Sequence, residues 1–110
     1  MKVAYIFTTT RAHKILSRMI IPQLEQGRHM VDVVGMFFFE DNAFLLQKGN
    51  EVGERLKILS DQSGMLLMAC DICAIERNIH KDLVEGAKIG CFPDLYEALS
   101  GVELDQVITL

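Results

Sequence analysis

Positive charge, cysteine and long hydrophobic runs are all scarce in this sequence of 110 residues. Its 11 lysines and arginines stand against 15 acidic residues, giving a formal net charge of -4. This balance argues against a nucleic-acid-binding protein, which needs a basic surface. No apolar run approaches the roughly 18 residues that a membrane-spanning helix requires. Three cysteines, an odd number, argue against a disulfide framework of the secreted type.

The length predicts a single domain covering residues 1–110. Half of the residues are hydrophobic and 24% are charged, which excludes the composition of a disordered chain. The first segment, MKVAYIFTTT, has only a short apolar stretch and no small-residue cleavage site. It therefore predicts a first strand rather than a signal peptide, and we expect a cytoplasmic protein.

Apolar, strand-like runs alternate with segments of helical periodicity along the chain. The runs predict strands near residues 2–8, 30–39, 65–69, 87–91 and 107–110. Strands that are continuously apolar and separated by helices indicate a parallel sheet that is covered on both sides. The sequence thus predicts a three-layer α/β fold, with a mainly parallel sheet of about five strands and helices on both faces.

The helical segments are predicted from spacing, caps and breakers. Apolar residues recur at helical spacing from Ile15 to Leu24, and Pro22 should kink or split this helix near Ile21. Asn50 can cap a second helix. Further helices are expected over residues 80–85 and after Pro93, the latter with Leu95, Tyr96 and Leu99 on its core side. The stretch from 43 to 47 reads as a short strand or an extended connection.

Reactive groups in parallel α/β sheets gather beyond the carboxyl ends of the strands. The residues that follow the predicted strands are Thr8–Thr10, Glu40–Asn42, Cys70 and Cys91. We therefore expect all of these residues to lie at one edge of the sheet.

The segment MACDICAIER, residues 68–77, places Cys70 and Cys73 in a C-x-x-C spacing. A zinc site needs more ligands, and although Cys91 with His13 or His80 could supply them, neither histidine has regular ligand spacing. No metal site is therefore predicted. A thioredoxin-like dithiol is not favoured either, because the negative charge of Asp71 would disfavour a thiolate.

A single reactive thiol at a strand-to-helix junction is the third interpretation of this motif. Cys70 stands where the strand ends, and a helix N-terminus stabilises a thiolate or persulfide anion. Cys73 follows one turn later, so it can relay or resolve what Cys70 carries. Three buried, purely structural thiols remain the alternative.

These residues are the basis of a resemblance to the DsrE/DsrF-like family of sulfur-relay proteins, which covers nearly the whole chain. Three segments carry it: MFFFEDNAFLLQKGNEVG (36–53), LLMACDICAIERNI (66–79) and EGAKIGCFPDLYEALSGVELDQVITL (85–110). In that family a strand-end cysteine is followed, after a short helix, by an Arg-Gly pair. Here Cys70 precedes Arg77 and Asn78 at a matching offset, and asparagine tolerates the left-handed conformation better than other non-glycine residues.

The resemblance implies that Cys70 carries a persulfide, whereas Cys73 and Cys91 are departures from a one-cysteine carrier. The pattern CDxC with GCFPDLY is similar to a DsrE-related subgroup named SaoD. The resemblance also implies a homo-oligomer, a trimer or hexamer, with sulfur donor and acceptor proteins as partners. No cofactor is predicted. Consecutive Phe37, Phe38 and Phe39 predict a strand buried on both faces, with one aromatic at a subunit contact as the alternative.

Six further residues are candidates for binding near the thiols, each with a plainer alternative. Arg11 could bind an anion or simply be solvated, and Glu40 and Asp41 could act as acid and base or solvate a loop. Arg77 could turn back toward Cys70 or end a helix as a solvated cation. The complete set is Thr9, Arg11, Glu40, Asp41, Asn42 and Arg77.

Two functions stay open from the sequence. The first is a cytosolic sulfur carrier, or sulfurtransferase, that binds sulfane sulfur as a persulfide on Cys70 and passes it to a partner, with Cys73 or Cys91 relaying or resolving it. The second is a non-catalytic oligomeric binding module with a cysteine-based metal or redox site.

Overall fold

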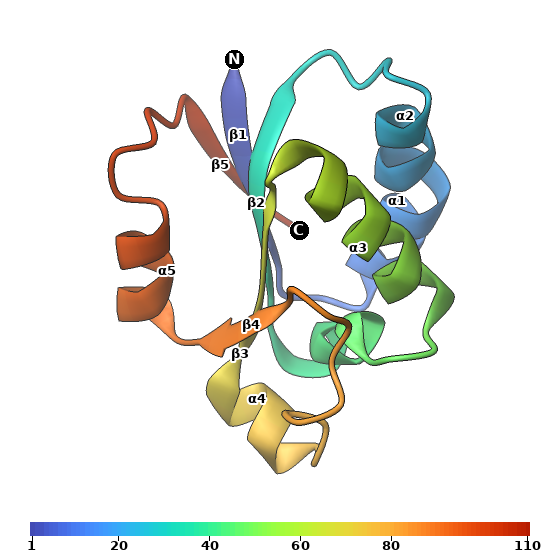
Figure 1. Cartoon of the computed structure of the whole chain (residues 1–110), viewed down its shortest axis with the longest axis vertical. Helices are drawn as coiled ribbons and strands as arrows, with labels where there is room; N and C mark the ends of the chain where they lie inside the picture. Colours follow the sequence, from blue (N-terminus) through green and yellow to red (C-terminus); the bar gives the residue numbers. More distant parts are fainter.

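The computed structural model describes all 110 residues as an α/β fold around one five-stranded sheet, in the order β4-β3-β2-β1-β5 (Figure 1). All neighbouring strands are parallel. The strands are β1 (Lys2–Phe7), β2 (Asp32–Phe38), β3 (Leu66–Cys70), β4 (Lys88–Gly90) and β5 (Gln106–Thr109). The predicted α/β fold with a parallel sheet and helices on both faces is confirmed.

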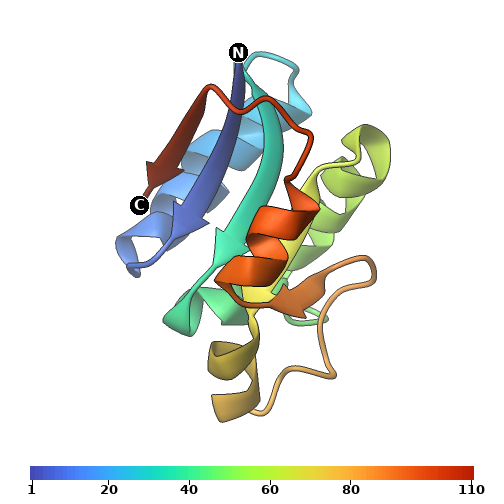
Figure 2. The ribbon, with the colours of Figure 1, turned by 90° about the vertical axis from the view of Figure 1, so that its left-hand side faces the viewer.

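The two faces of the sheet are covered unequally (Figures 1 and 2). One face carries α1 (Arg11–Ile15), η1 (Leu16–Ile20), α2 (Ile21–Glu25) and α3 (Glu51–Ser63), whereas α5 (Phe92–Ala98) lies alone on the other. The short helices η2 (Glu40–Leu46) and α4 (Asp71–Glu76) lie at the carboxyl ends of the strands. None of these helices has the length and apolar character needed to cross a membrane.

Two separate hydrophobic clusters reflect this asymmetry. The larger one holds 21 buried residues under α1 to α3, and the smaller one holds only five, under α5. Phe38 belongs to the first and Phe37 to the second, because successive side chains of a strand point to opposite faces. Strand β2 is therefore buried on both faces, as predicted, through Phe37 on one face and Phe38 on the other. Phe39 is only half-buried.

The first helical stretch runs without interruption from Arg11 to Glu25, but it changes type along the way. Residues 16–20 form a π-helical turn, and Pro22 lies in the first turn of α2, which begins at Ile21. A π turn changes the hydrogen-bond pattern ahead of a proline, whose ring nitrogen cannot donate. The predicted split near Ile21 thus takes the form of a change in helix type.

The long helix α3 begins as the sequence indicates. The side chain of Asn50 caps it, because its Oδ1 accepts a hydrogen bond from the backbone N–H of Val52 at 2.9 Å. Gly53 lies where α3 crosses η2: a Cβ at this position would stand 2.5 Å from the backbone oxygen of Leu45. The glycine therefore permits a close contact between the two helices.

Three local predictions are wrong. Residues 43–47 belong mainly to the 3-10 helix η2, and only Gln47 pairs as an isolated bridge, with Leu83. Residues 80–85 form turns rather than a helix, because this backbone bonds to the end of η2, as in the bond from Val84 N–H to the oxygen of Leu46. Tyr96 does not face the core but is 67% exposed.

Candidate functional site

The carboxyl ends of the central strands bring the expected groups to one edge of the sheet, which we call the thiol rim (Figure 1). It comprises Thr8–Thr10, Glu40–Asn42, Cys70, Cys73 and Cys91. Cys70 ends β3 and is paired in register with Gly90 of β4, so Cys91 follows in the neighbouring strand. Parallel pairing therefore places the three cysteines, distant in sequence, at the same end of the fold.

Cys70 is both the last residue of β3 and the N-cap residue of α4. Its side chain is buried, with 3% exposed, and it belongs to the cluster that contains Phe37, Met68 and Leu95. Met68 shares this side of the strand, as its two-residue offset from Cys70 predicts. Cys70 is thus a thiol held in an apolar setting at the point where strand becomes helix.

Cys73 is equally buried, with 3% exposed, and lies in the same cluster as Cys70. The backbone N–H of Glu40 donates a hydrogen bond to its Sγ at 3.1 Å, and Oε1 of Glu40 lies 4.0 Å from the same sulfur. Burial raises the pKa of the Cys73 thiol to about 11, and its contact with Cys70 contributes in the same direction. Cys73 is therefore a protonated thiol at neutral pH.

Glu40 adopts an uncommon backbone conformation to reach Cys73. Its φ of 52° lies in the left-handed region, where a residue with a Cβ costs on the order of 1–2 kcal/mol. This conformation accompanies the N–H bond to the Cys73 sulfur. Nothing in the local sequence predicts it, because glutamate has no preference for this region.

Arg77 joins η2 to α4 across the thiol rim. Its guanidinium donates to Asp41 Oδ1 at 2.9 Å, to Glu40 Oε2 at 3.1 Å and to the backbone oxygen of Cys73 at 3.1 Å. The hydrogen bond to Asp41, followed by that to Glu40, raises the pKa of Arg77. Arg77 is thus an anchor for two carboxylates: it is neither a free helix-end cation nor turned toward Cys70.

Cys91 is placed differently from the other two thiols. It is half-buried and is the N-cap residue of α5. The carboxylate of Asp94 accepts the N–H of Cys91 at 2.8 Å, as in a capping box. This bond uses the backbone of Cys91 rather than its thiol, and no hydrogen bond joins Cys91 to the other two cysteines.

The remaining candidates are Thr9, Arg11 and Asn42, and none of them forms a hydrogen bond with the thiols. Asn42 is buried, and its Nδ2 donates to the backbone oxygen of Thr9 at 3.2 Å, which ties η2 to the end of β1. Its Oδ1 has no hydrogen-bond partner. Arg11 is exposed at the start of α1 and takes part in none of the ion pairs. The structure therefore brings together Glu40, Asp41 and Arg77 with the thiol pair, and leaves Arg11 apart.

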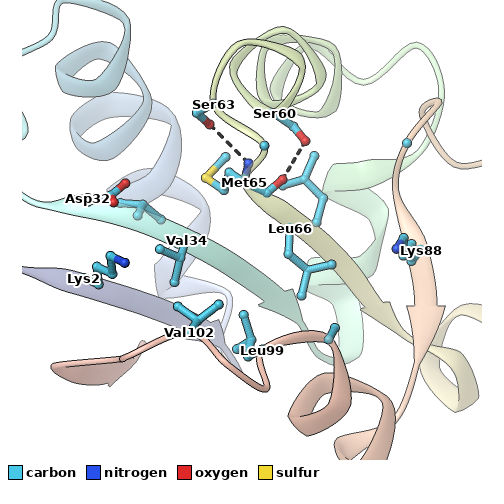
Figure 3. A pocket seen from close by; sticks show the side chains of 15 residues that line it. Lys2, Asp32, Val34, Ser60, Ser63, Met65, Leu66, Lys88, Leu99 and Val102 are labelled. Carbon is cyan, nitrogen blue, oxygen red and sulfur yellow. Dashed lines mark hydrogen bonds between the residues drawn. The ribbon is translucent and has the colours of Figure 1, made fainter.

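No group of three or more histidine, cysteine or acidic side chains is arranged to hold a metal ion. The largest cavity, of about 510 Å³, lies at the amino ends of the strands, the opposite end from Cys70 (Figure 3). Lys2, Asp32 and Lys88 are its charged residues, and its serine hydroxyls bond to the backbone of Met65 at 2.6 and 3.2 Å. This cavity contains no cysteine, so we take the thiol rim, which holds the nucleophilic thiols, as the candidate functional site.

The fold and the thiol rim define a small parallel α/β protein with paired cysteines at the end of its third strand. The chain belongs to the DsrE/DsrF-like family, whose model matches residues 1–110. This family is associated with sulfur relay. Among curated proteins, no relative matches the sequence.

Solved structures with the same fold come from bacteria and an archaeon. The ychN protein from E. coli matches with a TM-score of 0.69 and 21% identity, over 100% of both chains. MTH1491 from Methanobacterium thermoautotrophicum, of unknown function, has a TM-score of 0.63 and 15% identity over 96% of both chains. BT1422 from Bacteroides thetaiotaomicron, also of unknown function, has a TM-score of 0.64 and 15% identity, over 99% of this chain and 94% of its own. At these identities the likeness concerns the fold.

Proposed function

We propose that this protein is a sulfur carrier of a cytoplasmic relay, in which Cys70 holds sulfane sulfur as a persulfide. The observation that carries the proposal is the position of Cys70, buried at the junction of β3 and α4 in a chain that belongs to the DsrE/DsrF-like family. Strand ends of parallel sheets are where such folds concentrate their chemistry.

Loading of Cys70 is a transfer of one sulfur atom without net oxidation. The Cys70 thiolate attacks the outer sulfur of a donor persulfide, R–S–SH, and forms a new S–S bond while the donor thiolate RS⁻ leaves. Unloading is the same step in reverse direction, with the thiolate of an acceptor protein attacking the outer sulfur on Cys70. Cys70 returns to a thiolate that is ready for the next donor.

Burial of Cys70 determines how this exchange can occur. With 3% of the residue exposed, an incoming thiol reaches the sulfur only when the rim opens locally. α4 contains only six residues, and Ile72 and Ile75 expose 58% and 55% of their surface. Short elements with few buried contacts open at low free-energy cost, so α4 is the element that we propose moves.

We also propose that the carrier acts as a homo-oligomer, either a trimer or a hexamer. Support comes from the face that α5 covers incompletely. An apolar cavity of about 260 Å³ lies there between α5 and the sheet, bordered by Ile6, Leu104 and Val107. Val107 is 54% exposed, and a second copy of the chain placed on this face would bury it.

Intact-mass measurement after brief loading with glutathione persulfide tests the carrier function. The wild-type protein should gain the mass of one sulfur atom, the Cys70→Ser variant should gain none, and the Cys91→Ser control should behave as the wild type. Loading that survives in Cys70→Ser would reject Cys70 as the carrier. Circular dichroism of each variant establishes that the fold is retained.

A further inference from the structure

Cys70 and Cys73 form a pair of thiols that a one-cysteine carrier does not need. Both are buried in one hydrophobic cluster, and the proximity of Cys70 contributes to the raised pKa of the Cys73 thiol. Residues three apart on a helix have Cβ atoms about 5–6 Å apart, whereas a disulfide requires about 3.5–4.5 Å. Closing a bond between them therefore needs only a small movement at the first turn of α4.

The surroundings of Cys73 contain both a hydrogen-bond donor and a carboxylate close to its sulfur. The N–H of Glu40 points at its Sγ from 3.1 Å, and the carboxylate of the same residue is 4.0 Å away. Arg77 holds that carboxylate through its other oxygen, Oε2, at 3.1 Å. One residue, fixed from outside the pair, thus offers Cys73 both a hydrogen-bond donor and a proton acceptor.

We propose that Cys73 discharges the Cys70 persulfide by forming a Cys70–Cys73 disulfide and releasing hydrosulfide, so that the protein reduces sulfane sulfur when no acceptor collects it. This inference rests on the proposed persulfide of Cys70. It adds a second outcome to the carrier cycle: release of the sulfur in reduced form in place of transfer.

The step balances in atoms and electrons. The proton of Cys73 passes by way of the Glu40 carboxylate to solvent, and the Cys73 thiolate attacks Sγ of Cys70, its neighbour in the same buried cluster. The Sγ–Sγ bond forms as the bond from Cys70 Sγ to the outer sulfur breaks, and HS⁻ leaves with the electron pair. The two cysteines are oxidised by two electrons, and the sulfane sulfur is reduced to sulfide. A dithiol reductant, small or protein-borne, returns the disulfide to two thiols.

The high pKa of Cys73 makes the release slow at neutral pH. With a pKa of about 11, only about one molecule in ten thousand carries the Cys73 thiolate near pH 7. An acceptor protein that docks before the Cys73 thiolate attacks Cys70 collects the sulfur. The fraction of sulfur released as sulfide therefore depends on how long the loaded carrier stays without an acceptor.

Desalted, persulfide-loaded protein provides the test, with glutathione persulfide as the probe donor. In the wild type, the mass of one added sulfur should disappear and leave a protein two hydrogen atoms lighter than the reduced chain. One sulfide per chain should appear at the same time, trapped with monobromobimane. Cys73→Ser and Cys73→Ala should keep the added sulfur, and Cys91→Ser should release it as the wild type does.

The pH dependence of the wild type gives a second test that needs no variant. Sulfide release should accelerate about tenfold per pH unit below a pH of about 11, following the Cys73 thiolate. A loaded wild type that is stable, or that passes its sulfur intact to Cys73, overturns the release step and leaves the carrier function in place. Absence of any sulfur adduct in all variants overturns both.

Discussion

At the scale of single residues, Cys70 and Cys73 differ in the groups that contact their sulfur atoms. Cys70 lies among apolar side chains, whereas Cys73 also receives an N–H and faces a carboxylate, both from Glu40. Two thiols of equal burial can therefore have different tasks. In the proposed cycle, Cys70 accepts sulfur from outside the molecule, and Cys73 acts on Cys70.

Alkylation kinetics should expose the raised pKa of Cys73. With Cys70 and Cys91 replaced by serine, the rate of reaction with iodoacetamide should still be climbing above pH 9, because burial raises the pKa of Cys73 and only the thiolate reacts. A short unfolded peptide containing the same cysteine is the control and should level off near pH 9. A plateau at or below pH 9 in the folded variant would contradict the environment described for Cys73.

Residue by residue, the sequence predicted part of this site and missed its central contact. The position of Cys70 follows from the end of an apolar run, and Asn78 does adopt the left-handed conformation, with a φ of 55°. The partners of Arg77 could not be predicted, because Glu40 and Asp41 lie more than thirty residues away on another element. The bond from Glu40 to Cys73 depends on a backbone angle that glutamate rarely adopts.

At the scale of elements, the site depends on how η2 and α4 are held together. Arg77 of the turn after α4 contacts both acidic residues of the first turn of η2. The guanidinium and the bond from the Glu40 N–H to the Cys73 sulfur are the polar contacts that join the start of η2 to α4 and the turn after it.

Replacement Arg77→Ala should loosen both helices without unfolding the sheet. Hydrogen exchange followed by mass spectrometry should show faster exchange over residues 40–46 and 71–76, with the strands unchanged. Arg55→Ala is the matched control, because it removes an arginine that pairs with Glu25 on the far side of the sheet from α5. Equal protection of η2 and α4 in both variants would show that Arg77 does not hold them.

The crossing of α3 and η2 gives a prediction for stability. In an exposed helix, Gly→Ala stabilises by about 1 kcal/mol. At Gly53 the added methyl would meet the backbone of Leu45 at 2.5 Å, so we expect the free energy of unfolding to fall by about 1–3 kcal/mol. Urea denaturation measures the change, and the exposed Gln62→Ala on the same helix should stay within about 0.5 kcal/mol of the wild type. A more stable Gly53→Ala would contradict the close contact.

The elements that sequence patterns missed are those that depend on distant backbone. Residues 80–85 have helical spacing, but Leu83 and Val84 bond instead to the end of η2, which lies almost forty residues earlier. The three central strands β1, β2 and β3 were predictable because each contains a continuous apolar run, whereas β4 and β5 are shorter and largely exposed. Buried strands can therefore be predicted from a run of apolar residues. A turn region that is held by hydrogen bonds to a distant segment leaves no such local pattern.

At the scale of the whole molecule, the two faces of the sheet are covered unequally: one face holds most of the core, and the other is only partly covered by α5. Helices α1 to α3 enclose the larger cluster, which provides most of the buried apolar surface. The α5 face has one helix of seven residues, an apolar cavity and the buried pair Cys70 and Cys73. Assembly on this face would bring a neighbouring copy close to Cys70.

Substitution Val107→Glu tests the assembly. Size-exclusion chromatography with light scattering should give an oligomer for the wild type and a monomer for Val107→Glu, because an unpaired charge would be buried at the contact. Lys14→Glu, which reverses a charge on exposed α1, should leave the oligomer intact. A monomeric wild type, or an oligomer in Val107→Glu, would show that this face does not join subunits.

The most direct measurement of the central claim is the location of sulfur in a loaded Cys73→Ser protein. In this variant the peptide that contains residues 70 and 73 carries one cysteine, so tandem mass spectrometry after alkylation assigns the added sulfur atom without ambiguity. We expect a single extra sulfur on Cys70 and none on Cys91. Sulfur found on Cys91, or none on either cysteine after loading with glutathione persulfide, would contradict it.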